Sequence, residues 1–127
     1  MLKVLLVEDD DLTLAVLKSF LSSREFEVHT AMDGAQGITL LNGGGFDLVI
    51  SDVQMIPMDG MTFLRTVRDK GNPVPFIMMT AHPRMDGYIT AVQKLGAFEY
   101  IQKPLDLDVL MLVIQRLLNI DLPNSKA

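Results

Sequence analysis

The chain has 127 residues, which is the size of a single domain. It contains no cysteine and only two histidines, which excludes a disulfide framework, a thiol nucleophile and a cysteine-based zinc site. With 16 acidic and 11 basic side chains the net charge is -5, so we expect no direct nucleic-acid binding by this domain. Apolar runs stay shorter than the ~20 residues of a membrane span. The first run meets an acidic cluster rather than a cleavage site, and we therefore expect a cytoplasmic protein that does not bind membranes.

Five apolar runs of strand length recur along the chain, and each predicts a β-strand. The first, third and fourth are almost continuously hydrophobic, as strands are when helices cover both faces of a parallel sheet. The runs span residues 2–7, 26–31, 46–51, 74–80 and 98–101.

Segments with helical spacing of apolar residues separate these strands. The first follows the acidic cluster, with Asp11 as its expected N-cap, and the second covers residues 34–41 after Asp33. Two more are expected at residues 61–69 and 85–95.

The fifth helix is expected to begin near Asp106. Its apolar pattern places five side chains along one side, namely Val109, Leu112, Val113, Arg116 and Leu117. Strand and helix thus alternate five times, which predicts an α/β fold with an open parallel sheet and helices on both faces.

Chemically active side chains follow four of the five expected strands. In open parallel sheets, ligands bind beyond the carboxyl ends of the strands, so these side chains should meet at one edge. They are Glu8, Asp9, Asp10 and Asp11 after the first strand, Asp52 at the third, Thr80 and His82 at the fourth, and Lys103 with Pro104 after the fifth.

This set of side chains suits metal-assisted phosphoryl chemistry. Clustered carboxylates repel one another unless a cation lies between them, and oxygen ligands without histidine or cysteine favour Mg²⁺, with Mn²⁺ as the substitute. An aspartate can act as a nucleophile, while a metal ion and a lysine offset the charge of an incoming phosphoryl group. Each residue alone also has a structural interpretation, as a helix cap, a strand residue or a solvated lysine. Their joint placement, with active groups at four strand ends, favours a functional site.

Several stretches of the chain resemble the receiver domain of two-component response regulators, over about residues 2–118. The resemblance is carried by residues 4–10, 46–55, 58–60, 78–81 and 100–104, in this order and spacing. It implies a flavodoxin-like (βα)5 fold whose five parallel strands have the order 2-1-3-4-5. Residues 1–120 would form the receiver domain, and residues 121–127 a C-terminal tail or the start of a linker.

The resemblance also implies roles for individual residues. Asp52 matches the phosphoacceptor, which takes its phosphoryl group from a histidine kinase or phosphotransfer protein. Asp9 and Asp52 match the carboxylates that hold Mg²⁺, Glu8 is placed to hold a metal-bound water, and Gln54 would supply a backbone carbonyl to the metal.

Further matches concern the residues that switch on phosphorylation and those that set the lifetime of the phosphorylated state. Thr80 matches the hydroxyl that moves toward the phosphoryl group. Tyr100 matches the aromatic side chain whose rotamer changes with the movement of that hydroxyl. Lys103 matches the lysine that pairs with the phosphoryl group, and its bond to Pro104 is expected to be cis. Gln54 and His82 occupy the positions that tune the lifetime of the phosphorylated state.

The implied output is a change in surface rather than turnover of an external substrate. Phosphorylation would alter the face made by the fourth helix, fifth strand and fifth helix, which would bind a downstream partner or form a dimer. Residues expected on this face are Ile89, Val92, Gln93, Lys94 and Tyr100. Self-phosphorylation and slow self-dephosphorylation would be the only reactions, so the chain is not expected to be an enzyme.

The chain departs from the family pattern at three places, one of them being Glu8, where Asp is also common. Residue 56 is Ile where a proline is usual, and the proline is instead Pro57. This difference affects the expected conformation of the loop over the site. Phe98-Glu99 replaces an acidic pair that one subfamily uses to dimerise.

Three other functions stay open. One is a receiver-like scaffold that is never phosphorylated. Another is an aspartate-nucleophile phosphatase, although Gln54 stands where its general acid would be. The third is a flavin carrier, whose phosphate the acidic cluster would repel.

Overall fold

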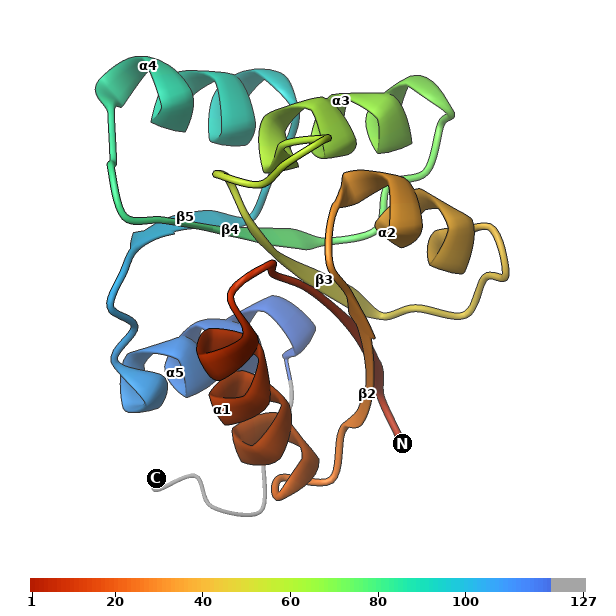
Figure 1. Ribbon diagram of the computed structural model, residues 1–127, viewed down its shortest axis with the longest axis vertical. Helices are drawn as coiled ribbons and strands as arrows, with labels where there is room; N and C mark the ends of the chain where they lie inside the picture. The colour runs from red at the N-terminus through yellow and green to blue at the C-terminus, as the bar shows by residue number, and fades with distance from the viewer. Residues whose placement is uncertain (120–127) are drawn as a thin grey trace.

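A five-stranded parallel sheet in the order β2-β1-β3-β4-β5 forms the centre of the molecule (Figure 1). The structure is a computed structural model that describes residues 1–119. The strands are β1 (Lys3–Val7), β2 (Glu27–Ala31), β3 (Leu48–Asp52), β4 (Phe76–Thr80) and β5 (Glu99–Gln102). The strand order and the parallel pairing confirm the predicted fold, and each strand lies within about two residues of its predicted position. The expected tail, residues 121–127, lies outside the described residues.

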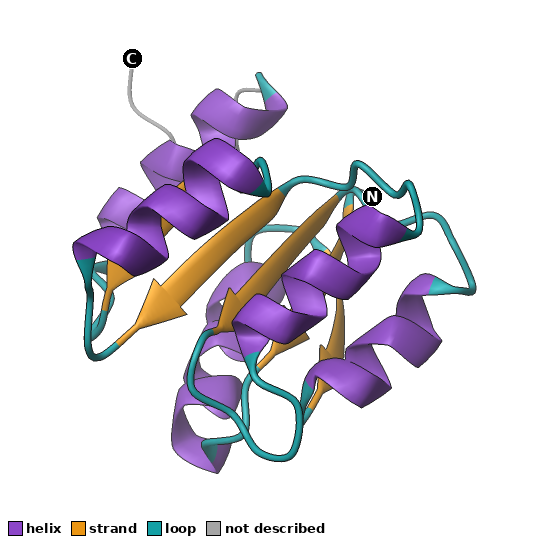
Figure 2. Ribbon diagram, turned by 90° about the horizontal axis from the view of Figure 1, so that it is seen from above, coloured by secondary structure: helices purple, strands orange, loops and turns teal. Residues whose placement is uncertain are grey.

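Helices cover both faces of the sheet (Figure 2). On one face lie α1 and α5, and on the other lie α2, α3 and the segment formed by α4 and η1 (Figure 1). The bounds are α1 (Asp11–Ser22), α2 (Gly34–Leu41), α3 (Gly60–Asp69), α4 (Met85–Tyr88), the π-helix η1 (Ile89–Lys94) and α5 (Leu107–Leu118).

The central strands separate two hydrophobic cores. Successive side chains of a strand point to opposite faces, so Val4 and Leu6 pack toward α1 and α5, while Leu5 and Val7 pack toward α2 and α3. Every residue of β3 and β4 is buried, which explains why both strands are hydrophobic up to the polar residues at their carboxyl ends. Burial of each large apolar side chain in these strands contributes roughly 1.5–3 kcal/mol, and it holds the carboxyl ends of the strands in a fixed arrangement.

Aspartate side chains cap four of the helices. Asp33, Asp59 and Asp106 cap α2, α3 and α5 by accepting hydrogen bonds from backbone N–H groups of the first turn. The predicted cap of α1, Asp11, is wrong: Asp10 has the extended backbone of an N-cap and accepts from the Thr13 N–H, whereas Asp11 is the first helical residue. The acidic run let either residue take this role.

The predicted helix over residues 85–95 is wrong in type beyond its first turn. Four residues form an α-helix, and the chain then continues as a π-helix, in which the Leu95 N–H donates to the Thr90 carbonyl at 2.9 Å. Apolar spacings of three and four residues do not separate these two helix types over so short a segment.

The side of α5 on which the apolar pattern places Val113 is buried only in part. Val109 and Leu112 are 47% and 60% exposed, whereas Leu110 and Ile114 are fully buried. Because α5 is apolar around most of its circumference, periodicity alone did not identify the buried side. None of the helices in residues 1–119 is long and apolar enough to cross a membrane.

Candidate functional site

Three carboxylates meet where β1 and β3 end. Glu8 and Asp9 follow β1, Asp52 is the last residue of β3, and β1 pairs directly with β3. One oxygen from each of the three lies within 4.8 Å of the others. Glu8 is fully buried and Asp52 is 4% exposed, while Asp9 is exposed. The topology therefore brings together the acidic residues that the sequence singled out.

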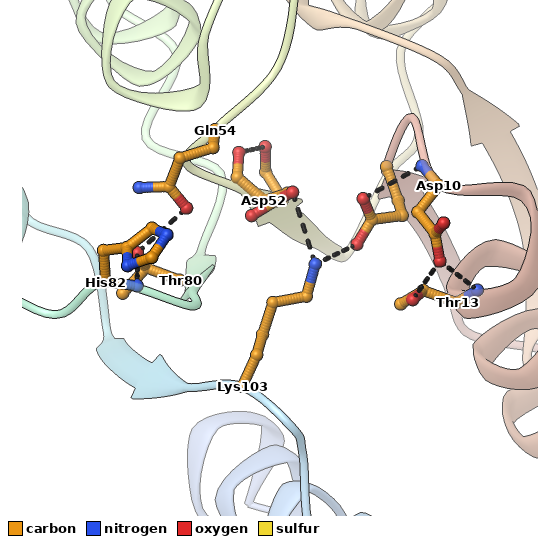
Figure 3. Close-up of polar contacts among 9 residues, drawn as sticks. Asp10, Thr13, Asp52, Gln54, Thr80, His82 and Lys103 are labelled. Atoms are coloured by element: carbon orange, nitrogen blue, oxygen red, sulfur yellow. Dashed lines mark hydrogen bonds and ion pairs between the residues drawn. The ribbon is translucent and has the colours of Figure 1, made fainter.

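Lys103 lies beside this acidic cluster. Its Nζ donates to Glu8 Oε1 at 2.6 Å and to Asp52 Oδ2 at 3.3 Å (Figure 3). The lysine follows β5, and its backbone N–H donates to the Thr80 carbonyl at 2.7 Å, which anchors it to β4. One ammonium thus faces two buried carboxylates, and the cluster keeps a net negative charge.

The shared burial shifts the pKa values of the pair. Burial is the largest influence on Glu8 and raises its pKa, as does the nearby Asp52, while the hydrogen bond from Lys103 opposes the shift. For Lys103, burial is again the largest single influence and lowers the pKa. The contacts with Glu8 and Asp52 together outweigh it, so the pKa of Lys103 is raised.

The residues present fit a hard divalent cation. Among residues 1–119, Asp52 Oδ1 is the one buried side-chain oxygen or nitrogen without a hydrogen-bond partner. Such an orphaned carboxylate oxygen, next to two further carboxylates, is satisfied by a bound cation. The donor set is made of oxygen only, which favours Mg²⁺ or Mn²⁺ over zinc or copper.

Asp10 does not belong to the cluster, although it lies in the same acidic run. Its Oδ2 accepts from the Thr13 N–H at 2.9 Å and from the Thr13 hydroxyl at 2.6 Å (Figure 3). These hydrogen bonds lower the pKa of Asp10, the bond from the Thr13 hydroxyl being the largest cause. Its carboxylate therefore serves as the cap of α1.

Thr80 and Gln54 form a second group beside Asp52. Thr80 ends β4 and is fully buried, and its Oγ1 donates to Gln54 Oε1 at 3.0 Å. The backbone N–H of His82 donates to the same Oγ1 at 3.0 Å. His82 is exposed. Its imidazole lies beside Gln54 and Thr80 (Figure 3). This Gln54–Thr80 contact was not predicted from the sequence, because it joins the loop after β3 to the last residue of β4, 26 residues away.

Tyr100 lies on β5 with its side chain against α4. Its ring packs edge-to-face on Tyr88, with centroids 6.2 Å apart, and its hydroxyl lies close to Gly87. A Cβ at Gly87 would be 2.6 Å from this hydroxyl, so the missing side chain makes room for it. The structure thus places Tyr100 beside the α4 segment rather than in the acidic cluster.

The loop after β3 approaches the site closely at Gly60. A Cβ at that position would lie 2.0 Å from the backbone oxygen of Asp52, so only glycine fits there. Met58-Asp59-Gly60 carries part of the family resemblance, but no role of Gly60 was expected from the sequence. The Ile56–Pro57 and Lys103–Pro104 bonds are both cis, the second as expected.

Comparison with known proteins finds the family of response regulator receiver domains. The sequence profile described as "Response regulator receiver domain" matches residues 4–115. The chain is 34% identical over 118 residues to the regulatory protein AtoC of Escherichia coli K12, covering 93% of this chain and 25% of that protein. It is 33% identical over 113 residues to the DNA-binding transcriptional regulator NtrC of the same organism, covering 89% and 24%. The chain spans about a quarter of the length of these relatives.

Solved structures agree with the family match. A response regulator receiver domain protein from Clostridium thermocellum superposes with a TM-score of 0.85 at 30% identity, covering 94% of this chain and 95% of that one. The chemotaxis protein CheY4 of Vibrio cholerae gives a TM-score of 0.84 at 29% identity, covering 92% and 98%.

Proposed function

The chain belongs to the response regulator receiver domain family, and from this premise we propose that Asp52 is the residue on which it accepts a phosphoryl group. The domain is a phosphoaspartate receiver of two-component signalling, a signalling domain rather than an enzyme acting on an external substrate. The assignment of Asp52 rests on its burial and on the contacts of its two carboxylate oxygens. It is a nearly buried carboxylate with Lys103 at 3.3 Å on Oδ2 and no partner on Oδ1.

The transfer that we propose is a displacement at phosphorus. A carboxylate oxygen of Asp52 attacks the phosphorus of a phosphohistidine, a P–O bond forms, and the P–N bond breaks with its electron pair left on the imidazole. Lys103 is placed to offset the charge on the transferring group, since it already donates to Asp52. Hydrolysis of the acyl phosphate by water would return Asp52 to its starting form.

We propose that Mg²⁺ is held by Asp9 and Asp52, with Glu8 placed to hold a metal-bound water and the Gln54 backbone carbonyl as a further ligand. When bound, the cation would neutralise the cluster and reduce the repulsion felt by an incoming phosphoryl group. The proposal is supported by the three convergent carboxylates and by the orphaned Asp52 Oδ1. Mn²⁺ would fit the same oxygen ligands.

We propose a histidine kinase or a phosphotransfer protein as the phosphodonor. An apolar groove of about 570 Å³ lies beside Lys103, between α1 and the start of α5. Leu12 and Val16 of α1 line it and are 74% and 46% exposed, so a partner could bury apolar surface next to the phosphoacceptor. A donor docked there could present its histidine to Asp52.

The switching residues and the output surface are also proposals. Thr80 would donate to the phosphoryl group, and the rotamer of Tyr100 would change with the movement of Thr80. Gln54 and His82 would set how readily water reaches the acyl phosphate. The face of α4, η1, β5 and α5 would then bind a downstream partner or a second copy of the chain. Exposed Phe98 and Leu112 support an apolar contact on this face. We further propose that the domain works in the cytoplasm, does not itself bind nucleic acid, and ends near residue 120.

Intact mass after incubation with acetyl phosphate and Mg²⁺ tests the proposed function. We expect a gain of one phosphoryl group in the wild type, and no gain in Asp52→Asn or with a chelator present. A phosphatase would instead release phosphate continuously. Gln54 does not support this activity, because its carboxamide cannot transfer a proton as a general acid does. No labelling by acetyl phosphate or by any histidine-phosphorylated donor would favour the unphosphorylated scaffold.

A further inference from the structure

The hydroxyl of Thr80 has already committed its only proton. A threonine hydroxyl offers one donor and two acceptor positions. In Thr80 the proton goes to Gln54 Oε1 at 3.0 Å, and the His82 N–H occupies an acceptor position at 3.0 Å. Because a phosphoryl oxygen can only accept, Thr80 can serve it only after releasing Gln54.

The hydrogen bond from Thr80 goes to an exposed side chain and not to the proposed phosphoacceptor. Asp52 pairs with Met79, the residue before Thr80, across β3 and β4. Asp52 Oδ1 is buried and has no partner, yet Thr80 donates to the exposed Gln54 instead (Figure 3). In the resting protein the hydroxyl proton of Thr80 is therefore held by Gln54 and is not available to a phosphoryl group on Asp52.

We propose that the side chain of Gln54 is a latch that holds Thr80 in its resting position. This inference rests on the proposed role of Asp52 and adds to it a positioning residue, which acts through Thr80 and not on the reacting atoms. It differs from a role in hydrolysis, since it acts on the equilibrium between the resting and the switched state. Gln54 is exposed, so its amide is hydrated once released, and the latch biases the switch without blocking it.

Binding of beryllofluoride, a phosphoryl analogue that is not turned over, measures this bias without a contribution from hydrolysis. Its dissociation constant would be determined by calorimetry at saturating Mg²⁺ for the wild type, Gln54→Met, Thr80→Ala and the double variant. Methionine keeps the length of glutamine and removes the acceptor. Gln115→Met, on α5, is the matched control.

We expect Gln54→Met to bind beryllofluoride about two- to tenfold more tightly, the range that corresponds to one net hydrogen bond. In the Thr80→Ala background the same substitution should add nothing, because no proton is left to release. Gln115→Met should behave as the wild type. Equal tightening in both backgrounds, or no tightening with Thr80 present, would overturn the latch. A wild-type protein that binds no beryllofluoride would instead contradict the proposed phosphoacceptor site.

Discussion

Lys103 donates to Glu8 Oε1 at 2.6 Å and reaches the phosphoacceptor candidate Asp52 only at 3.3 Å. The lysine is thus held mainly by the fully buried acid next to Asp52. This contact partly compensates the negative charge of a cluster of three carboxylates. A cation that neutralised Glu8 and its neighbours would weaken the contact and leave Lys103 freer to pair with a phosphoryl group.

Magnesium should stabilise the protein, because a ligand that binds only the folded state shifts the unfolding equilibrium. We expect a Tm that rises with Mg²⁺ concentration in the wild type and no rise in Asp9→Asn, measured by thermal unfolding. Asp10→Asn is the matched control, because asparagine also caps helices and the Asp10 carboxylate is already bound to Thr13. A loss of the magnesium response in Asp10→Asn would place the metal elsewhere.

Glu8→Gln should stabilise the metal-free protein at neutral pH, on the order of 1 kcal/mol. Burial raises the pKa of Glu8, so the folded state binds its proton more tightly than the unfolded chain does. The stability that this proton contributes is present below the unfolded pKa and is lost as pH rises through the folded pKa.

Urea unfolding with a chelator, in steps from pH 4 to pH 8, tests this sign. Relative to Glu8→Gln, the free energy of unfolding of the wild type should fall as the pH rises above the ordinary glutamate value. A constant difference between the two proteins across this range would show that Glu8 does not carry the shift.

Lys103→Met should slow phosphorylation on the order of a hundredfold, the usual cost of losing a group that offsets charge in the transition state. It should also lower the Tm in chelator, because two buried carboxylates lose their partner. Time courses of labelling by acetyl phosphate measure the first effect. An exposed lysine on α1, Lys18→Met, should change neither quantity.

Gly60→Ala should destabilise the fold by about 3 kcal/mol, because the new Cβ would meet the Asp52 backbone oxygen at 2.0 Å and force the loop away. Gly43→Ala is the control, since its Cβ would come no closer than 3.3 Å to another atom, the Leu40 carbonyl oxygen. Chemical unfolding of both variants measures the difference. Equal stabilities would mean that the loop after β3 shifts freely.

His82→Ala should shorten the lifetime of the phosphorylated state, because an exposed side chain beside the site would no longer hinder water. Decay of phosphorylated protein after removal of the donor, followed by intact mass, measures the lifetime. An unchanged decay rate would mean that the imidazole has no part in excluding water, leaving only the backbone contact with Thr80.

The sequence by itself determined the layered fold and the membership of most of the site. Continuous apolar runs alternating with helical spacing require buried parallel strands, and parallel strands place their carboxyl ends at one edge. That rule brought Glu8, Asp9, Asp52 and Lys103 together, because each directly follows or ends a strand.

Only the tertiary structure decided which neighbours pair. Whether Asp10 caps a helix or binds a metal depends on the position of Thr13 in space, and four acids in a row look alike in sequence. The Gln54–Thr80 hydrogen bond and the close approach of Gly60 to Asp52 join segments that local pattern does not connect. The π-helix and the buried side of α5 were equally hidden, because short apolar segments satisfy more than one periodicity and packing selects among them.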